Sequence, residues 1–280
     1  MVAFTVDLED WYHGLEIDIS EWPKREERLR KGLDVLLSLL DHADTKATFF
    51  ILGWIADRYP EVVREIDALG HEIGSHSYWH RKVYHLTPRE FKEDILRTSD
   101  ALSQITGKKV EGFRAPYFSI TSASLWALDI LKECGFTYDC SISPVITWRY
   151  GVPCARENLY YMPRHKLWEY SLSTFRFLGK KIGIGGAYMR LFPYTMASHS
   201  LSALSSAGIP AMFYCHPWEY DPDHPRERGI SLRAQITHYT GLSGMAGRTA
   251  QLLADFKCDT VSSIIASQKN QHIGNYLNGR

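Results

Sequence analysis

Two histidines, His76 and His80, stand four residues apart after an apolar run. On a helix, positions i and i+4 share a face, so both imidazoles could reach one metal ion. In a loop, Gly74 and Ser75 would let the backbone turn so that the two rings converge. A lone histidine pair at this spacing is more often structural, so its meaning depends on what else the chain carries.

Three carboxylates follow another apolar run, at the start of the chain. Val2 to Val6 is β-branched and aromatic, which predicts a buried strand, and Asp7, Glu9 and Asp10 lie at its carboxyl end. Catalytic groups of α/β folds gather at that end of parallel strands. A solvated acidic turn would give the same pattern, so this segment alone leaves both interpretations open.

The elements that would position these residues alternate over the first 140 residues. Further strands are expected at 47–53, 71–76, 110–114 and 136–139, and helices at 26–42, 61–69, 88–106 and 124–134. Thr87 and Glu90 form a capping-box pattern at the third helix. This rhythm predicts a parallel sheet or barrel. Successive strand ends would bring the carboxylates, the histidine pair, Arg114 and Asp139 to one edge.

The rhythm breaks after residue 145. The elements expected there are β segments and a glycine-rich loop up to residue 186, a helix at 194–207, a buried strand at 210–215, a helix at about 247–256 and a frayed tail after Ile265. We expect one domain over residues 1–280, with an insertion at about 145–207 and an extension at about 222–280.

Composition indicates an ordinary globular protein. The 280 residues carry 32 basic and 32 acidic side chains, so nothing points to nucleic acid, which usually needs a basic face. Five cysteines without a C-x-x-C pair predict free thiols in a reducing compartment. The N-terminus lacks a basic region and no run of eighteen apolar residues occurs, so we expect no signal peptide and no membrane span. These features favour the cytoplasm. The sequence does not indicate an oligomeric state.

Five segments, in order, resemble the motifs of NodB-type polysaccharide deacetylases, carbohydrate esterase family four. They are residues 5–10, 76–80, 114–117, 139–141 and 214–216. The resemblance covers about residues 1–140 and 208–225. Residues 145–260 resemble the C-terminal extension of the subgroup found in exopolysaccharide loci, through 183–191 and 216–222. The expected fold is therefore an α/β fold, a distorted (β/α) barrel of this family.

The resemblance implies metal-assisted removal of an N-acetyl group from an amino sugar. A divalent metal, most often Zn²⁺, would polarise the carbonyl and lower the pKa of its bound water from about 16 toward 7. His76 and His80 would be ligands. The family pattern has two adjacent aspartates, whereas two residues separate Asp7 from Asp10 here. The third ligand is then Asp10, which we favour slightly, or Glu9, which by strand alternation shares a face with Asp7.

The resemblance also implies the other roles. Asp7 aligns with the general base, and Arg114 would hold it ionised. His216 would be the general acid, with Asp139 as a candidate acidic partner. The Tyr117 N–H is a candidate oxyanion donor. The side chains implied to line the acetyl pocket are Trp148 and Trp218. The histidines interpreted as structural or surface residues are His13, His42, His71, His165, His199 and His238.

Two other functions fit the same fold. Metal-independent ureide or cyclic-amide hydrolases have lost the ligand histidines, and a degenerate sugar-binding module would lack Asp7 or His216, yet all these residues are present. The resemblance implies, as substrate, an N-acetylated sugar of a polysaccharide or of its lipid-linked precursor in exopolysaccharide biosynthesis. The protein would meet a lipid-linked substrate at the inner membrane face, as a peripheral contact.

Overall fold

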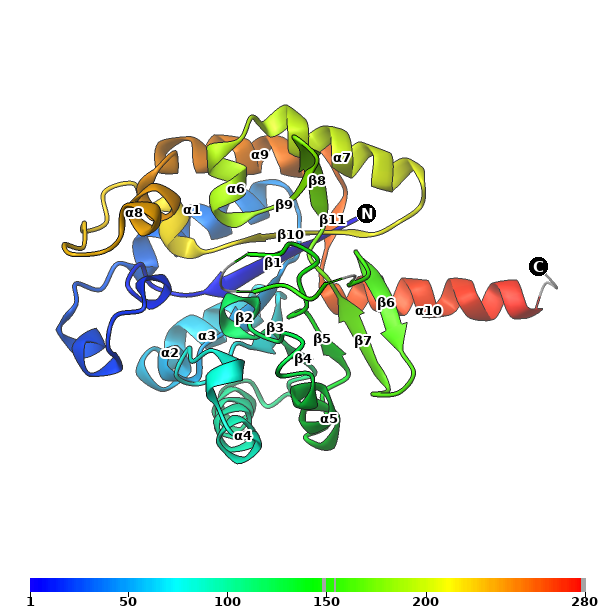
Figure 1. Ribbon diagram of the computed structural model, residues 1–280, viewed down its shortest axis with the longest axis horizontal. Coiled ribbons are helices and arrows are strands. Elements are labelled where there is room, and N and C mark those ends of the chain that lie inside the picture. The colour runs from blue at the N-terminus through cyan, green and yellow to red at the C-terminus, as the bar shows by residue number, and fades with distance from the viewer. Residues whose placement is uncertain (148–149, 154, 278–280) are drawn as a thin grey trace.

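The computed structural model describes residues 1–147, 150–153 and 155–277, with the side chains of the last helix described as far as Asn270. A nine-stranded sheet forms its centre and curls into a half-barrel, with helices packed around it (Figure 1). The strands lie in the order β10-β1-β2-β3-β4-β5-β7-β6, and β11 pairs with β1. Pairing is parallel except between β6 and β7. This is the α/β, barrel-type architecture that the sequence predicts.

The strands of this sheet are β1 (Val2–Leu8), β2 (Thr48–Ile51), β3 (Glu72–Ser75), β4 (Gly112–Phe113), β5 (Tyr138–Asp139), β6 (Leu159–Met162), β7 (Leu167–Tyr170), β10 (Ala211–Cys215) and β11 (Cys258–Asp259). A separate hairpin consists of β8 (Thr174–Phe177) and β9 (Lys180–Gly183). The helices are α1 (Leu29–His42), α2 (Gly53–Arg58), α3 (Pro60–Ala68), α4 (Pro88–Thr106), α5 (Trp126–Glu133), α6 (Gly186–Leu191), α7 (Tyr194–Ser206), α8 (Leu232–Tyr239), α9 (Met245–Asp255) and α10 (Val261–Leu277).

Strand β1 sorts its side chains between the two faces of the sheet. Phe4 and Val6 belong to the large apolar cluster beneath the helices, whereas Ala3 belongs to the cluster inside the half-barrel. Successive side chains of a strand point to opposite faces. Asp7 therefore lies on the inner face with Ala3, and Glu9 continues that row just beyond the strand.

Helix α4 begins and ends where its sequence specifies. The Thr87 hydroxyl accepts a hydrogen bond from the Glu90 N–H at 3.3 Å, and the Glu90 carboxylate accepts one from the Thr87 N–H at 2.8 Å. This is the predicted capping box. Gly107 ends the helix with φ at 71°, a left-handed conformation that glycine adopts without strain. The buried face of the helix includes Asp94, which positions part of the candidate site.

Side chains bridge the seam of the half-barrel between β7 and β10. The Tyr170 hydroxyl donates to the Ala211 carbonyl at 2.8 Å. The Met212 N–H donates to the Ser173 hydroxyl at 2.8 Å. These bonds satisfy backbone groups on β10, which pairs with β1 on its other side.

The start of helix α10 fills the end of the half-barrel where the strands begin. The Val261 N–H donates to the Thr48 hydroxyl at 2.8 Å, and the Ser262 N–H donates to the Glu72 carboxylate at 3.1 Å. Both acceptors are the first residues of their strands. Ile264 is 1% exposed and belongs to the apolar cluster inside the half-barrel.

The structure contains helices that the sequence did not predict. Helix α2 follows β2 directly, α6 occupies the end of the expected glycine-rich loop, and α8 lies where no helix is expected. Helix α10 continues well beyond Ile265, where we expected a frayed tail. Its first turns are buried against the half-barrel, and tertiary packing of this kind supplies most helix stability in proteins.

No helix within the described residues is long and apolar enough to cross a membrane. The four described cysteines are Cys134, Cys140, Cys215 and Cys258, and all are free thiols. The fifth, Cys154, lies outside the described residues.

Ile264→Ala should lower the free energy of unfolding by about 2–5 kcal/mol, because it opens a cavity where the start of α10 packs inside the half-barrel. Urea denaturation measures the change. Ile209→Ala is the matched control, because Ile209 is 41% exposed, and it should change stability by about 0.5 kcal/mol or less. Equal effects of the two substitutions would show that α10 does not fill the half-barrel as described.

Candidate metal and catalytic centre

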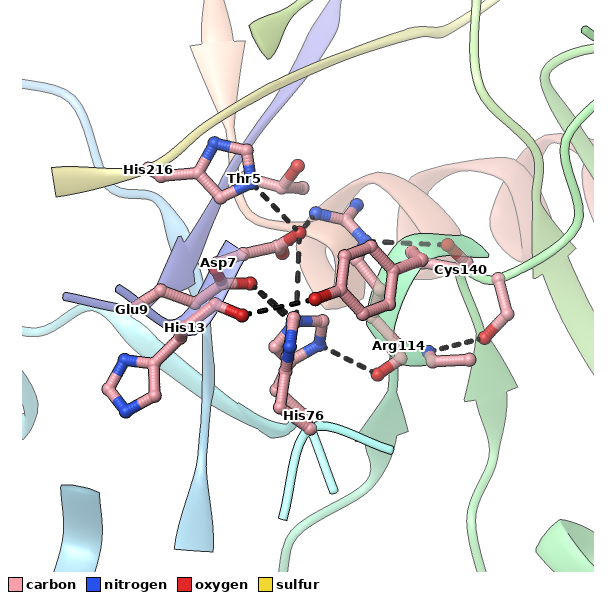
Figure 2. Close-up of polar contacts among 12 residues, drawn as sticks. Thr5, Asp7, Glu9, His13, His76, Arg114, Cys140 and His216 are labelled. Carbon is pink, nitrogen blue, oxygen red and sulfur yellow. Dashed lines mark hydrogen bonds and ion pairs between the residues drawn. The ribbon is translucent and has the colours of Figure 1, made fainter. Parts of the chain in front are cut away.

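Three side chains converge just beyond the carboxyl ends of β1 and β3. Glu9 Oε1 lies 3.1 Å from His76 Nε2 and 2.8 Å from His80 Nε2. All three residues are buried, and their ligand-type atoms lie within 4.8 Å of one another. Figure 2 shows Glu9 and His76 facing each other across this point. Two imidazole nitrogens and a carboxylate form a donor set that suits Zn²⁺ and leaves coordination positions open.

The hydrogen bonds of His76 also indicate a cation here. Its Nδ1 lies 2.8 Å from the Arg114 carbonyl oxygen, which can only accept, so Nδ1 carries the proton. In a neutral imidazole, Nε2 then presents a lone pair to Glu9, which is also an acceptor. Two acceptors at this distance need a cation or a proton between them. A carbonyl that orients a histidine through its other nitrogen is typical of metal sites.

The loop between the two histidines is held by α2 and α4. Asp94 of α4 accepts hydrogen bonds from the N–H groups of Tyr78, at 2.6 Å, and Trp79, at 3.3 Å. The Gly53 N–H, at the start of α2, donates to the Ser77 carbonyl at 2.9 Å. His80 itself has φ at 52°, a left-handed conformation that is rare outside glycine. The two rings therefore converge from a fixed loop, not from one helix face.

The carboxylate of Asp10, the favoured candidate for the third ligand, lies against the start of α1 and not beside the two histidines. Asp10 Oδ1 accepts from the Trp11 N–H at 2.8 Å, and Oδ2 accepts from the N–H groups of Arg28, at 2.8 Å, and Leu29, at 3.0 Å. Asp10 thus satisfies backbone donors at the start of α1, which have no partner within the helix. Glu9 occupies the position beside the histidines, as the alternation of β1 allowed.

Asp7 forms an ion pair with Arg114 inside the half-barrel. Arg114 Nη1 donates to Asp7 Oδ1 at 2.7 Å, and the arginine side chain is 0% exposed (Figure 2). The other carboxylate oxygen, Oδ2, lies 4.0 Å from His76 Nε2 and 3.9 Å from His216 Nε2. One oxygen of Asp7 is therefore paired with Arg114, and the other faces the space between His76 and His216.

The acidic partner of His216 is Glu219, not Asp139. His216 Nδ1 lies 3.0 Å from Glu219 Oε2, which also accepts from the His216 N–H at 3.0 Å. Burial would lower the pKa of His216, but the hydrogen bond to Glu219 and the charges of Glu9, Glu219 and Asp7 outweigh it and raise the pKa to about 9. His216 is therefore protonated at neutral pH.

Asp139 lies deeper, opposite Glu169 of β7, and is 0% exposed. The Ser141 hydroxyl donates to Asp139 and accepts a hydrogen bond from the Ala115 N–H at 2.8 Å. Burial raises the pKa of Asp139 to about 6 and the pKa of Glu169 further above its usual range. Asp139 therefore supports the turn that follows Arg114 and does not contact His216.

A cleft of about 170 Å³ opens over these groups. Its lining includes Asp7, Glu9, His80, Tyr117, His216 and Trp218. Tyr117 and Phe118 have φ of 56° and 51°, so the backbone after Pro116 is also left-handed. Strained backbone of this kind is often found at functional sites. Trp148, which the resemblance assigned to the acetyl pocket, lies outside the described residues.

The cleft lining also includes residues from the C-terminal half of the chain, and of these only Tyr214 belongs to one of the five motif segments. They are Tyr150, Ala187, Arg190, Tyr214, Ala234, Thr237 and His238. His238 stacks on Trp218 with ring centroids 4.1 Å apart, and Trp218 stacks on His216 at 5.1 Å. His238, which the sequence suggests is a structural or surface residue, therefore lines the cleft. Because it lies on the unpredicted helix α8, no local pattern could have placed it at the cleft.

Two family models match this chain, one after the other. Residues 26–138 match the polysaccharide deacetylase family, and residues 140–266 match a domain of unknown function, DUF3473. A peptidoglycan-N-acetylglucosamine deacetylase of Bacillus cereus is 34% identical over 95 residues, which cover 34% of this chain and 34% of that protein. The chain therefore spans well under half of that relative's length.

Two solved structures show the same fold. A Mycobacterium smegmatis protein assigned as a polysaccharide deacetylase superimposes with a TM-score of 0.67 over 97% of this chain and 90% of that one, at 21% identity. A PuuE allantoinase superimposes with a TM-score of 0.53 over 77% of each chain, at 18% identity. The fold is thus shared by proteins named for different reactions, and the site must distinguish them.

The chain thus combines a segment that matches the polysaccharide deacetylase family, residues 26–138, with a segment that matches the domain of unknown function, residues 140–266. This confirms the resemblance seen in the motifs and the expected fold class. The sheet crosses the boundary between the two matched regions, because β7 pairs with β5. Strand β10 of the second region pairs with β1, which lies ahead of both regions.

Glu9→Gln should abolish tight Zn²⁺ binding, whereas Asp10→Ala should retain it and lower stability by about 1–2 kcal/mol. Glutamine removes the negative charge of Glu9 and is a weaker metal ligand than a carboxylate. Asp10, in contrast, accepts hydrogen bonds from N–H groups at the start of α1. Calorimetric titration of metal-free protein with Zn²⁺ measures the first effect, and urea denaturation measures the second. Retained binding in Glu9→Gln together with loss in Asp10→Ala would reverse the assignment.

Proposed function

We propose that the chain is a metal-dependent hydrolase that removes the N-acetyl group from an amino sugar of a carbohydrate. The observation that supports this is the convergence of Glu9, His76 and His80 in a cleft that also holds Asp7 and a protonated His216. Amide hydrolysis needs an activated water, a stabilised oxyanion and a proton for the departing amine, and these residues supply the corresponding groups.

Glu9, His76 and His80 would hold the metal, and Zn²⁺ suits this set of nitrogen and oxygen donors. When bound there, the ion would polarise the acetyl carbonyl and acidify a water molecule. Trp218, which stacks on His216 in the cleft, would pack against the acetyl methyl group.

Asp7 would act as the general base. Its Oδ2 accepts a proton from the attacking water as a bond forms between the water oxygen and the carbonyl carbon. Arg114 pairs with the other oxygen, Oδ1, and so fixes the orientation of the Asp7 carboxylate. The Tyr117 N–H would stabilise the oxyanion.

His216 would act as the general acid. Its Nε2 proton passes to the amide nitrogen as the C–N bond breaks, which releases acetate and the free amino sugar. The Glu219 carboxylate binds Nδ1 of the His216 ring. Nε2 of the same ring therefore faces Asp7 Oδ2, 3.9 Å away. The proposed base thus lies on β1 and the proposed acid directly follows β10, the strand that pairs with β1.

We infer further that the substrate is an N-acetylhexosamine of a polysaccharide or of its lipid-linked precursor, met in the cytoplasm or at the inner membrane face. The support is the resemblance to the exopolysaccharide-locus subgroup, together with the free thiols of the described cysteines. Aromatic residues of the inserted region could contact lipid, since Tyr161 and Phe177 are 43% and 39% exposed, whereas Phe175 is buried.

Purified protein loaded with Zn²⁺ should release acetate from N-acetylglucosamine oligosaccharides, or from a lipid-linked oligosaccharide, and should not hydrolyse allantoin. Asp7→Asn should retain the metal and lose roughly 10²-fold or more in rate, the usual scale for loss of a general base. Acetate assays and elemental analysis measure both properties.

Full activity after metal removal, or hydrolysis of allantoin in place of the sugars, would favour the metal-independent ureide hydrolase. Tight sugar binding without acetate release would favour a sugar-binding module. Equal rates on free and lipid-linked sugars would argue against the membrane-face role.

Glu219→Gln should move the alkaline limb of kcat/KM to lower pH. The general acid works only when protonated, so activity falls as pH rises through the pKa of His216, which is about 9. Without the Glu219 charge, that pKa should fall toward about 6.5, the ordinary value for histidine. Rate profiles for wild type and variant, measured with the same metal, test this. An unchanged alkaline limb would show that Glu219 does not govern the acid.

A further inference from the structure

Arg190, from helix α6, is a buried cation beside the catalytic cleft. Its side chain is 0% exposed, yet it also contributes to the cleft lining. Residue 190 lies within the region that matches the domain of unknown function, residues 140–266. An arginine cannot lose its charge in a protein, so its burial must be compensated by partners.

The first partner of Arg190 is Glu219. Arg190 Nε donates to Glu219 Oε1 at 2.6 Å, and both side chains are 0% exposed. Glu219 Oε2 holds His216, so one carboxylate joins the guanidinium to the imidazole. Burial would raise the pKa of Glu219, but the Arg190 charge, with that of His216, holds this pKa below its usual value. Glu219 therefore remains ionised while fully buried.

The second partner of Arg190 is the end of helix α8. Arg190 Nη2 donates to the Thr237 carbonyl at 2.7 Å, and Nη1 donates to the Thr240 carbonyl. The last carbonyls of a helix lack partners within it, and a cation there is also favoured by the helix dipole. Helix α8 lines the cleft through Ala234, Thr237 and His238.

We propose that the domain of unknown function completes the active site, and that Arg190 is the positioning residue through which it does so. This inference rests on the proposed deacetylase function. One guanidinium fixes the Glu219 carboxylate that orients His216 and also fixes the helix that walls the cleft. The general acid and the substrate wall are thus set by the same side chain, and Arg190 itself takes no part in proton transfer.

The chemistry of this position requires arginine. Its planar fork offers five donors, and three of its nitrogens bond to three separate acceptors here. Lysine would keep the charge next to Glu219 but could not reach all three acceptors in this geometry. Arg190→Lys should therefore restore part of what Arg190→Met removes.

The two functions of Arg190 can be separated by variants. Glu219→Gln leaves the bonds from Arg190 to α8 in place, so it should lower kcat about 10-fold or more with KM little changed. Arg190→Met removes both connections, so it should lower kcat by a similar factor and also raise KM several-fold. In Arg190→Met/Glu219→Gln the losses in kcat should be less than multiplicative, because both substitutions interrupt one path. Zn²⁺ content should stay at the wild-type level in every variant.

Arg28→Met is the matched control. Arg28 forms a partly buried ion pair with Asp221, which lies two residues beyond Glu219. Its two bonds are Nε–Oδ2 at 2.7 Å and Nη2–Oδ1 at 2.8 Å. It contacts neither His216 nor α8 in the bonds described. This control should lose stability but keep kcat and KM of the folded protein within about twofold of wild type.

Equal kcat values for folded Arg190→Met and Arg28→Met would overturn the proposal and leave Arg190 as a structural residue. A fall in kcat of Arg190→Met with unchanged KM would show that Arg190 does not position helix α8 for substrate binding. If wild type itself released no acetate and bound no Zn²⁺, the proposed function would fail first, an outcome distinct from these. Should Arg190→Met not fold, Arg190→Lys and Glu219→Gln still test both connections.

Discussion

The ion pair between Arg114 and Asp7 is the interaction on which the site depends. The guanidinium is fully buried, bonds to Asp7 at 2.7 Å and to the Cys140 carbonyl at 3.3 Å, and lies 4.3 Å from the centre of the Phe50 ring. A charge so far from water is tolerated only with partners of this quality, and loss of one partner of a buried pair typically costs about 3–5 kcal/mol. The same residue orients His76 through its backbone carbonyl. The proposed base, Asp7, and the proposed metal ligand, His76, are therefore both aligned by Arg114, which directly follows β4.

The sequence was most informative where a local rule fixes the geometry. The capping box at Thr87 and Glu90 and the two-residue alternation of β1 both appear in the structure as expected. That alternation also explains why Glu9, not Asp10, joins the histidines: residues two apart share a face, and the next residue turns toward α1. The preference for Asp10 assumes instead that the strand has ended and that the Asp10 side chain can swing toward the histidines.

The rest of the site depends on contacts between distant segments. Asp139 lies at the end of a strand, as the sequence predicts. The register of β5 and β7, however, places it opposite Glu169, a residue that belongs to none of the motifs. Glu219 lies only three residues from His216, yet its importance becomes visible only once Pro217–Tyr220 folds as a short 3-10 helix and returns its carboxylate to the imidazole. Arg190 and His238 reach the cleft from helices whose sequences show no catalytic pattern. Such residues cannot be found by spacing along the chain.

The backbone of the site is arranged before any substrate arrives. His80, Tyr117 and Phe118 all adopt left-handed conformations, which cost about 1–3 kcal/mol each for residues with a β-carbon. Packing sustains this strain: Asp94 binds the loop before His80, and Ser141 binds the Ala115 N–H ahead of Tyr117. The reacting groups consequently need little reorganisation, which is how electrostatic stabilisation of a developing oxyanion becomes effective. The C-terminal region extends the same principle, because the buried Arg190–Glu219 pair fixes His216, the proposed acid.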